Sequence, residues 1–188
     1  YALFTPAVTG DSPANAKLEF HDATIATTDA TALTLPSTEL VDITVTGTNS
    51  LTAGGSGNVI TTNGQALSVT GGGNLSLEAP FYGVNVNGMG AISISIYGDL
   101  TFDTVYQPIS TIGDITVSAK SITSKSGYYF NPTGTYTFTV ETVTYKTTQA
   151  ETKDHKDLVN AVTDSFRYES DLMYINSRKE LVNLQNEP

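Results

Sequence analysis

Two carboxylates and one amine are spaced so that a repeating fold would bring them together. Glu78, Asp103 and Lys125 follow one another at nearly equal intervals along the chain. If each interval forms one coil of a stack, they lie on successive coils about 4.8 Å apart, in a column that continues to Thr28 and Gly54. Stacked carboxylates favour a shared proton, a cation such as calcium between them, or an ion pair with the amine. The column predicts either a cation or sugar site or a surface ladder without function.

Tyrosines recur beside this column with nearly the same period. Tyr82, Tyr106 and Tyr128 follow one another at similar intervals, and Phe81 precedes the first of them. Exposed tyrosines at one corner of three coils offer an apolar ring face and a polar tip, which suits stacking on sugar rings. The alternative is that the rings only pack on each other or face inward. Together with the charged column, they predict a ligand-binding patch.

The chain offers little for catalysis. A polysaccharide lyase needs an Arg or Lys base beside a calcium site, and a hydrolase needs clustered carboxylates. The coils contain no Arg and only Lys17, Lys120 and Lys125, so Lys125 beside Glu78 and Asp103 is the one arrangement that could qualify. We expect a protein that is not an enzyme and assign it no catalytic residue.

These residues are positioned by a repeated apolar-polar-apolar triplet followed by a tight polar turn. A period of roughly 24 residues, made of short alternating runs, is typical of a β-solenoid. Three candidate strands per period predict an all-β fold, a right-handed single-stranded parallel β-helix of about five coils. The triplets are Leu18-Glu19-Phe20, Ile43-Thr44-Val45, Leu67-Ser68-Val69, Ile92-Ser93-Ile94 and Ile115-Thr116-Val117.

Alternation predicts which side of the first strand is buried. The apolar members of each triplet point inward and the polar members point outward. The outward face then carries pairs of Thr and Ser on successive coils. Such an array can order water, as on ice-binding β-helices, although the mixture of Ser with Thr and the presence of Glu19 and His21 favour an ordinary solvated face.

The end of the chain has a different pattern. Leu158, Val162 and Phe166 recur at four-residue spacing after Asp154, a suitable N-cap, and this predicts a short amphipathic helix. We expect a β-helix domain over 1–147 and a C-terminal helical cap or appendage over 148–188. A cap would cover the open strand edges. The alternative is a linker or partner-docking helix that joins a neighbouring domain.

The composition of the chain disfavours nucleic acid as a partner and a membrane-spanning segment. The net charge is −10 and only 15% of residues are charged, which disfavours nucleic acid because phosphates are bound by clustered Lys and Arg. No apolar run approaches the length that a membrane-spanning helix needs, so we expect no membrane span. The chain begins at Tyr1 without Met, which predicts adjoining domains in a longer chain. Abundant Thr, Ser, Gly and Asn favours an extracellular or cell-surface location.

The stretch from Lys17 to Gly127 resembles a bacterial family of secreted or surface β-helix proteins described as carbohydrate-binding. The likeness rests on Ile43-Thr44-Val45-Thr46-Gly47-Thr48-Asn49-Ser50-Leu51, on Leu67-Ser68-Val69-Thr70-Gly71-Gly72-Gly73-Asn74-Leu75 and on Tyr82-Gly83-Val84. The resemblance implies the non-catalytic form of the pectin-lyase-like fold. It also implies binding of acidic plant polysaccharides such as pectin, with calcium held by surface carboxylates.

We therefore expect an extracellular carbohydrate-binding or adhesive surface module that is not catalytic and binds a polysaccharide or cell-surface glycan. The alternative is a structural or stalk domain of a larger bacterial surface protein without its own ligand, and the third is a polysaccharide lyase. We expect no cofactor apart from calcium as a candidate, and assign no metal ligands. The expected ligand-binding residues are Glu78, Tyr82, Asp103, Tyr106, Lys125 and Tyr128.

Overall fold

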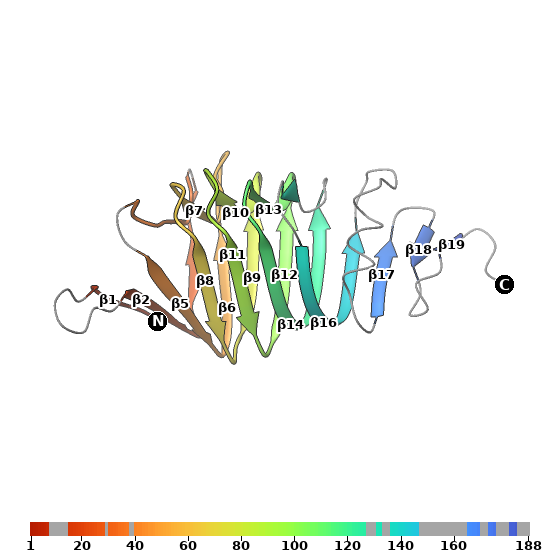
Figure 1. Cartoon of the computed structure of the whole chain (residues 1–188), viewed down its shortest axis with the longest axis horizontal. Coiled ribbons are helices and arrows are strands. Elements are labelled where there is room, and N and C mark those ends of the chain that lie inside the picture. The colour runs from red at the N-terminus through yellow and green to blue at the C-terminus, as the bar shows by residue number, and fades with distance from the viewer. Residues whose placement is uncertain are drawn as a thin grey trace.

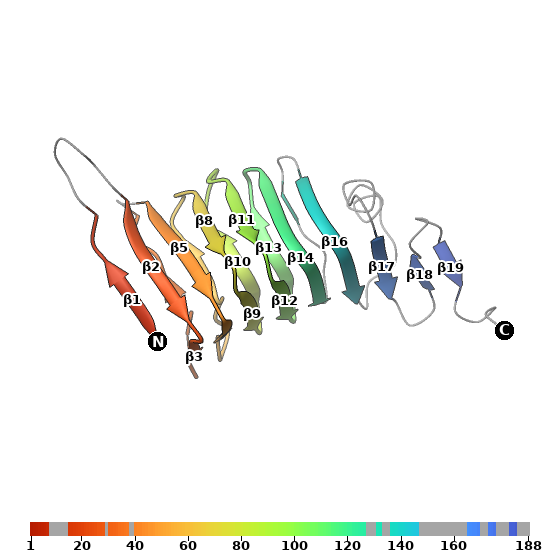
Figure 2. The ribbon, with the colours of Figure 1, turned by 90° about the horizontal axis from the view of Figure 1, so that it is seen from below.

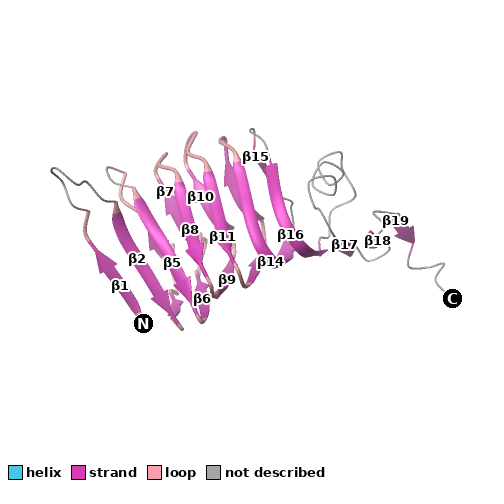
Figure 3. Cartoon of the chain, turned by 60° about the horizontal axis from the view of Figure 1, so that its bottom comes forward, coloured by secondary structure: helices cyan, strands magenta, loops and turns pink. Residues whose placement is uncertain are grey.

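The computed structural model describes residues 1–7, 15–28, 30–37, 40–126, 131–132, 136–146, 165–169, 173–175 and 181–183. These residues form a parallel β-solenoid of about four turns, where the sequence predicts about five coils. Figures 1 and 2 show the coils stacked side by side along the long axis. The described part of the chain is all-β and contains no helix (Figure 3).

Each turn contributes strands to three faces. The first face holds β2 (Ala16–His21), β5 (Val41–Thr46), β8 (Leu67–Gly71), β11 (Ile92–Ile96) and the beginning of β14 (Ile115–Ser126). The second holds β3 (Thr24–Ala26), β6 (Thr48–Thr52), β9 (Asn74–Ala79), β12 (Asp99–Thr104) and the end of β14. The third holds β4 (Leu33–Thr34), β7 (Ile60–Thr62), β10 (Tyr82–Val86), β13 (Gln107–Thr111) and β15 (Asn131–Pro132).

Two strands join or close the first face. β14 runs through the corner and pairs with β11 and β12, so the first and second faces form one continuous sheet. β1 (Ala2–Thr5), which the repeat does not predict, pairs antiparallel with β2 and lies at the N-terminal end of the stack in Figure 2. All four residues of β1 are exposed, so this strand covers the backbone edge of β2 and buries no side chain of its own.

The predicted alternation is confirmed by burial. The ten inward residues of the five triplets are all buried, and none is more than 9% exposed. The core continues under the second face with Leu51, Leu77 and Phe102 and under the third with Val84 and Ile109. Burial of these columns explains why short alternating strands form a stable stack. Each apolar side chain is removed from water and packs against the equivalent side chains on the neighbouring coils.

The predicted register is wrong by two residues in the second turn. Ile43 lies beside Val69, where the sequence aligns it with Leu67, and Leu51 lies beside Leu77. The cause is a longer glycine-rich corner, because eight positions separate Thr52 from Ile60 but only six separate Glu78 from Val84. A shift of two keeps the same side chains inside, so burial does not reveal it.

The C-terminal segment continues the strand pairing. β16 (Tyr136–Lys146) pairs in parallel with β14 along its whole length, and β17 (Ser165–Glu169) pairs in parallel with β16. β18 (Met173–Ile175) and β19 (Leu181–Asn183) form an antiparallel pair. Asp154, Leu158 and Val162 of the predicted helix, and the predicted boundary at 147, lie outside the described residues. Phe166 lies in β17, so the helical spacing does not extend to it.

Neighbouring glycines at the corner after β8 provide a test of this geometry. Gly71 has a φ of +136°, and a Cβ there would collide with the carbonyl oxygen of Val45 on the coil below, whereas nothing lies near a Cβ at Gly72. We expect Gly71→Ala to lower the free energy of unfolding by more than about 1 kcal/mol. Gly72→Ala, the matched control, should change it by less than about 0.5 kcal/mol. Urea unfolding measures both, and equal effects would contradict the stacking.

Candidate functional site

Glu78, Asp103 and Lys125 occupy successive positions of one outward column on the second face. Glu78 of β9 pairs with Asp103 of β12, which pairs with Lys125 of β14. The preceding members are Thr52 and Ala26, so the predicted extension of the column to Gly54 and Thr28 is wrong. The error has the same origin as the register shift, namely the longer corner of the second turn.

The members of this column satisfy one another. The Lys125 amine contacts the Asp103 carboxylate at 3.5 Å, and their side chains are 55% and 54% exposed. The Thr52 hydroxyl donates a hydrogen bond of 3.4 Å to the Glu78 carboxylate. Such exposed pairs are screened by water and contribute little to stability. Among the described residues, no three Asp, Glu or His side chains form a group able to hold a metal ion.

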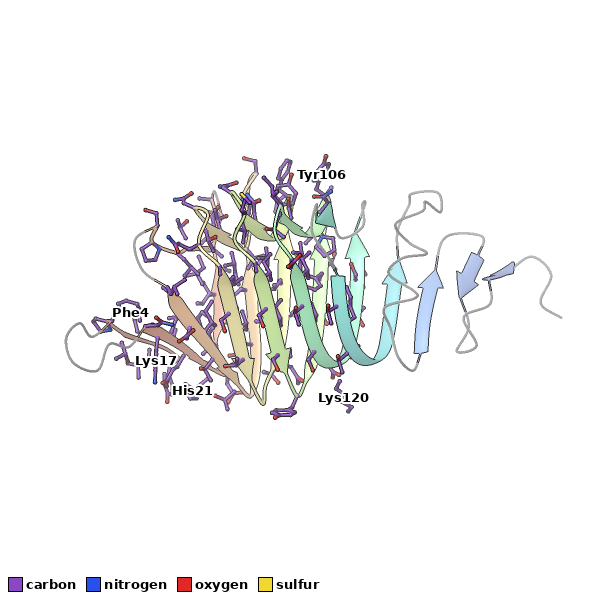
Figure 4. The ribbon with its side chains drawn as sticks, viewed as in Figure 1. Phe4, Lys17, His21, Tyr106 and Lys120 are labelled. Carbon is purple, nitrogen blue, oxygen red and sulfur yellow. The ribbon has the colours of Figure 1, made fainter. Side chains whose placement is uncertain are left out.

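Three aromatic rings form a cluster where the second face meets the third, here called the aromatic corner: Phe81, Tyr82 and Tyr106. The rings of Phe81 and Tyr106 stack with centroids 5.0 Å apart and planes 10° apart. Tyr82 meets both edge-on, with centroids 4.6 Å from Phe81 and 5.4 Å from Tyr106. Figure 4 shows Tyr106 at the upper edge of the solenoid. Tyr128, the third predicted tyrosine, lies outside the described residues.

Strand register explains why Phe81, and not Tyr82, stacks on Tyr106. Tyr82 pairs with Gln107, and the Tyr106 amide donates to the Phe81 carbonyl at 3.3 Å. The interval that links the two tyrosines in the sequence is therefore one position shorter than the structural period at this corner. The predicted ligand-binding residues omit Phe81 for this reason, although its interval from Tyr106 equals the structural period and would have identified it.

Gly83 holds the aromatic corner against the core. A Cβ at this position would approach the Pro108 carbonyl oxygen to 2.6 Å and the Phe102 ring to 2.8 Å. Phe102 is fully buried beneath β10. The absence of a side chain at Gly83 thus lets β10 lie directly on the Phe102 ring. This contact fixes how far Tyr82, the first residue of β10, lies from the core.

A shallow open depression of about 360 Å³ lies on the outer side of the third face, between β10 and β13. Tyr82 lines one end and Ile112 the other, and the polar side chains of Asn85, Asn87 and Ser110 line it between them. The Asn85 side-chain amide donates to the Asn87 carbonyl oxygen at 3.0 Å. The sequence prediction did not include these residues. Asn85 and Ser110 are nevertheless separated by the same interval as Tyr82 and Gln107, which is the structural period between these two strands.

The surroundings of the Tyr82 phenol shift its pKa. Burial, followed by the neighbouring Tyr106, raises the pKa of Tyr82 above its ordinary value of 10.0, and a hydrogen bond with Ser110 partly offsets this rise. Tyr82 is therefore a neutral phenol at neutral pH. It presents a hydroxyl and an uncharged ring to whatever occupies the depression.

Comparison of the chain with protein-family models, with curated proteins and with solved structures finds no match. Within the described ranges, no helix has the length and apolar character needed to cross a membrane.

Removal of the Lys125 amine tests whether the charged column is structural. We expect Lys125→Ala to change the free energy of unfolding by less than about 1 kcal/mol, because the ion pair with Asp103 is exposed. Ile122→Ala on the same strand removes a buried side chain and should cost about 2 to 5 kcal/mol. A loss at Lys125 comparable to that at Ile122 would show that the column carries the fold.

High pH tests the environment of Tyr82. A phenol whose pKa is higher in the folded than in the unfolded state stabilises the fold below pH 10.0, and this stability is lost as the pH rises through the folded-state pKa. We expect the free energy of unfolding to fall less steeply above pH 10.0 in Tyr82→Phe than in the unmodified protein. Urea unfolding at a series of pH values measures this. Tyr97→Phe, which removes one phenol from an exposed ring elsewhere, is the matched control, and identical slopes in both variants would contradict the assignment.

Proposed function

We propose that this protein is a non-catalytic carbohydrate-binding module whose site consists of the aromatic corner and the adjoining depression on the third face. The observation that carries the proposal is the direct contact between the two, since Tyr82 belongs to the ring cluster and also lines the depression. Sugars combine apolar ring faces with dense hydroxyl groups. They are bound where aromatic rings adjoin side chains that both donate and accept hydrogen bonds.

The aromatic corner leaves ring surface available to a ligand. Phe81 is 41% exposed even though Tyr106 stacks on it. An apolar sugar face can replace water on the exposed part of this ring.

The polar groups of the depression suit hydroxyl recognition. Asn85 and Asn87 each carry an amide that is both donor and acceptor, and Ser110 adds a hydroxyl. The positions of Asn85 and Asn87 are restrained by the hydrogen bond between their amides. Restrained side chains lose little conformational entropy when a ligand binds. Glu78, Asp103 and Lys125 lie on the adjacent second face, where they can contact a longer chain.

The wider expectations belong to the same proposal. They comprise an extracellular or cell-surface location, kinship with the bacterial β-helix family, right-handed winding and a C-terminal helical cap. Right-handed winding follows from the general preference for right-handed connections between parallel strands. The abundance of Thr, Ser, Gly and Asn with few charged residues supports a surface location.

Two other functions are distinguished by specific observations. A structural or stalk domain of a larger surface protein is favoured by the internal pairing of the charged column, which leaves Asp103 bound to Lys125. A polysaccharide lyase would require Lys125 to act as a base on the substrate, and its amine instead contacts the Asp103 carboxylate. Appearance of unsaturated sugar ends during incubation with a polysaccharide, lost in Lys125→Ala, would support the lyase.

Retention of the purified protein by soluble polysaccharides in native affinity electrophoresis tests the proposal. We expect Tyr106→Ala to weaken retention about tenfold, because the substitution removes the ring on which Phe81 stacks. Tyr97→Ala, which removes an 86% exposed tyrosine outside the aromatic corner, should leave retention unchanged.

The outcomes separate the candidates. Retention that is equal in Tyr106→Ala and in the unmodified protein would refute the aromatic corner as the site. Absence of retention on every polysaccharide, with a normal unfolding midpoint, would favour the structural or stalk domain.

A further inference from the structure

The segments that form the proposed site carry no positively charged side chain. No Lys or Arg occurs between Lys17 and Lys120, a stretch that includes β10, β13 and the aromatic corner. Residues 79–98 and 104–113, which form these elements and their corners, contain no charged residue of either sign. In Figure 4, Lys120 and His21 lie at the lower edge of the solenoid, opposite Tyr106.

The charges that flank the site are negative. Glu78 and Asp103 precede the aromatic corner on β9 and β12, and Asp114 follows Ile112 closely at the other end of the depression. Lys125, the cation of the same column, has its amine 3.5 Å from Asp103, so this pair adds no net charge and Glu78 remains as the net negative charge of the column. A polyanion lying along the third face would meet carboxylates at both ends and no ammonium or guanidinium group within the described strands of that face.

The lining of the depression is suited to an uncharged ligand. The hydrogen bond between Asn85 and Asn87 uses one Nδ2 hydrogen of Asn85 and the Oδ1 of Asn87, so it leaves the Oδ1 of Asn85 and the Nδ2 group of Asn87 for a ligand. These groups and the Ser110 hydroxyl can bind sugar hydroxyls, which donate and accept in the same way. They provide no charge to offset the dehydration of a carboxylate or sulfate.

From these observations we infer that the site selects neutral glycans and discriminates against acidic ones. The inference rests on the proposed carbohydrate-binding function and gives it a substrate class. It differs from the expectation of pectin-like acidic polysaccharides that the family resemblance implies. The physical reason is that acidic polymers need cationic side chains or a bridging cation, and the described strands of the third face have neither arginine nor lysine.

Polysaccharide pairs that share a backbone and differ in charge test the inference. Suitable pairs are hydroxyethylcellulose with carboxymethylcellulose, dextran with dextran sulfate, and methyl-esterified pectin with polygalacturonate. We expect retention on the neutral member of at least one pair, at least about tenfold weaker retention on its acidic partner, and no change on the neutral member between low and high salt. Each measurement is made with calcium and with a chelator.

Two results would contradict the inference in different ways. Stronger retention on the acidic member, whether sensitive to salt or dependent on calcium, would overturn neutral selectivity and leave carbohydrate binding intact. No retention on either member of any pair would refute carbohydrate binding itself, and the selectivity with it.

A charge added to the site provides a second measurement. Ser110→Lys places an ammonium group on the lining of the depression, and we expect it to increase retention on the acidic member about fivefold or more. The unfolding midpoint of the variant confirms that it folds. A folded Ser110→Lys protein that shows no gain on any acidic polymer would mean that charge does not determine selectivity, and the inference would be wrong.

Discussion

Every feature of this protein depends on the parallel stacking of one coil on the next. Stacking satisfies the backbone hydrogen-bonding groups of each strand and also buries the inward side chains against their counterparts. Neither gain is available to a single coil, because one turn has no partner for its backbone and no layer to cover its core. The corners must therefore hold their shape closely enough that the next coil can pair along all three faces. The buried Asn49 illustrates how this is done: its Oδ1 accepts from the Ala23 amide on the coil below, and its Nδ2 donates to the carbonyl of Asn74 on the coil above.

The corners at the end of the first face repeat this solution with different residues. The Asp22 carboxylate accepts from the Thr48 amide, and the Asn74 side-chain carbonyl oxygen accepts from the Asp99 amide. In each case one side chain replaces the strand pairing that the turn interrupts. Leaving the buried Ala23 amide unpaired would cost about 1 to 3 kcal/mol, whereas water can replace the partner at the exposed Thr48 and Asp99 amides. This explains why Asn and Asp, together with glycines such as Gly71, occupy positions where hydrophobic burial gives no information.

The inward columns could be predicted from the sequence, because a side-chain period of two leaves only one choice of buried face for residues such as Ile92 and Ile94. The register of the second turn could not, because Ile43-Thr44-Val45 resembles Leu67-Ser68-Val69 more closely than the residues with which it pairs. Corner length, not strand similarity, determines register. The proposed binding site could be predicted only in part, for a related reason. Tyr82 and Tyr106 are conspicuous as residue types, whereas Phe81 and Asn85 matter through their neighbours on adjacent coils.

The same stacking that builds the fold also decides which of its surface columns can bind a ligand. In the charged column, Glu78 and Asp103 each contact a partner on one neighbouring coil, Thr52 and Lys125 respectively, so both carboxylates are partnered without a ligand. The aromatic corner differs because Phe81 remains 41% exposed although the Tyr106 ring stacks on it. Gly83 lets the adjoining strand lie close to Phe102, and the next residue toward the corner, Tyr82, lines the depression. The proposed site therefore lies where stacking leaves an aromatic ring partly exposed beside polar side chains, and not where neighbouring coils pair their side chains with one another.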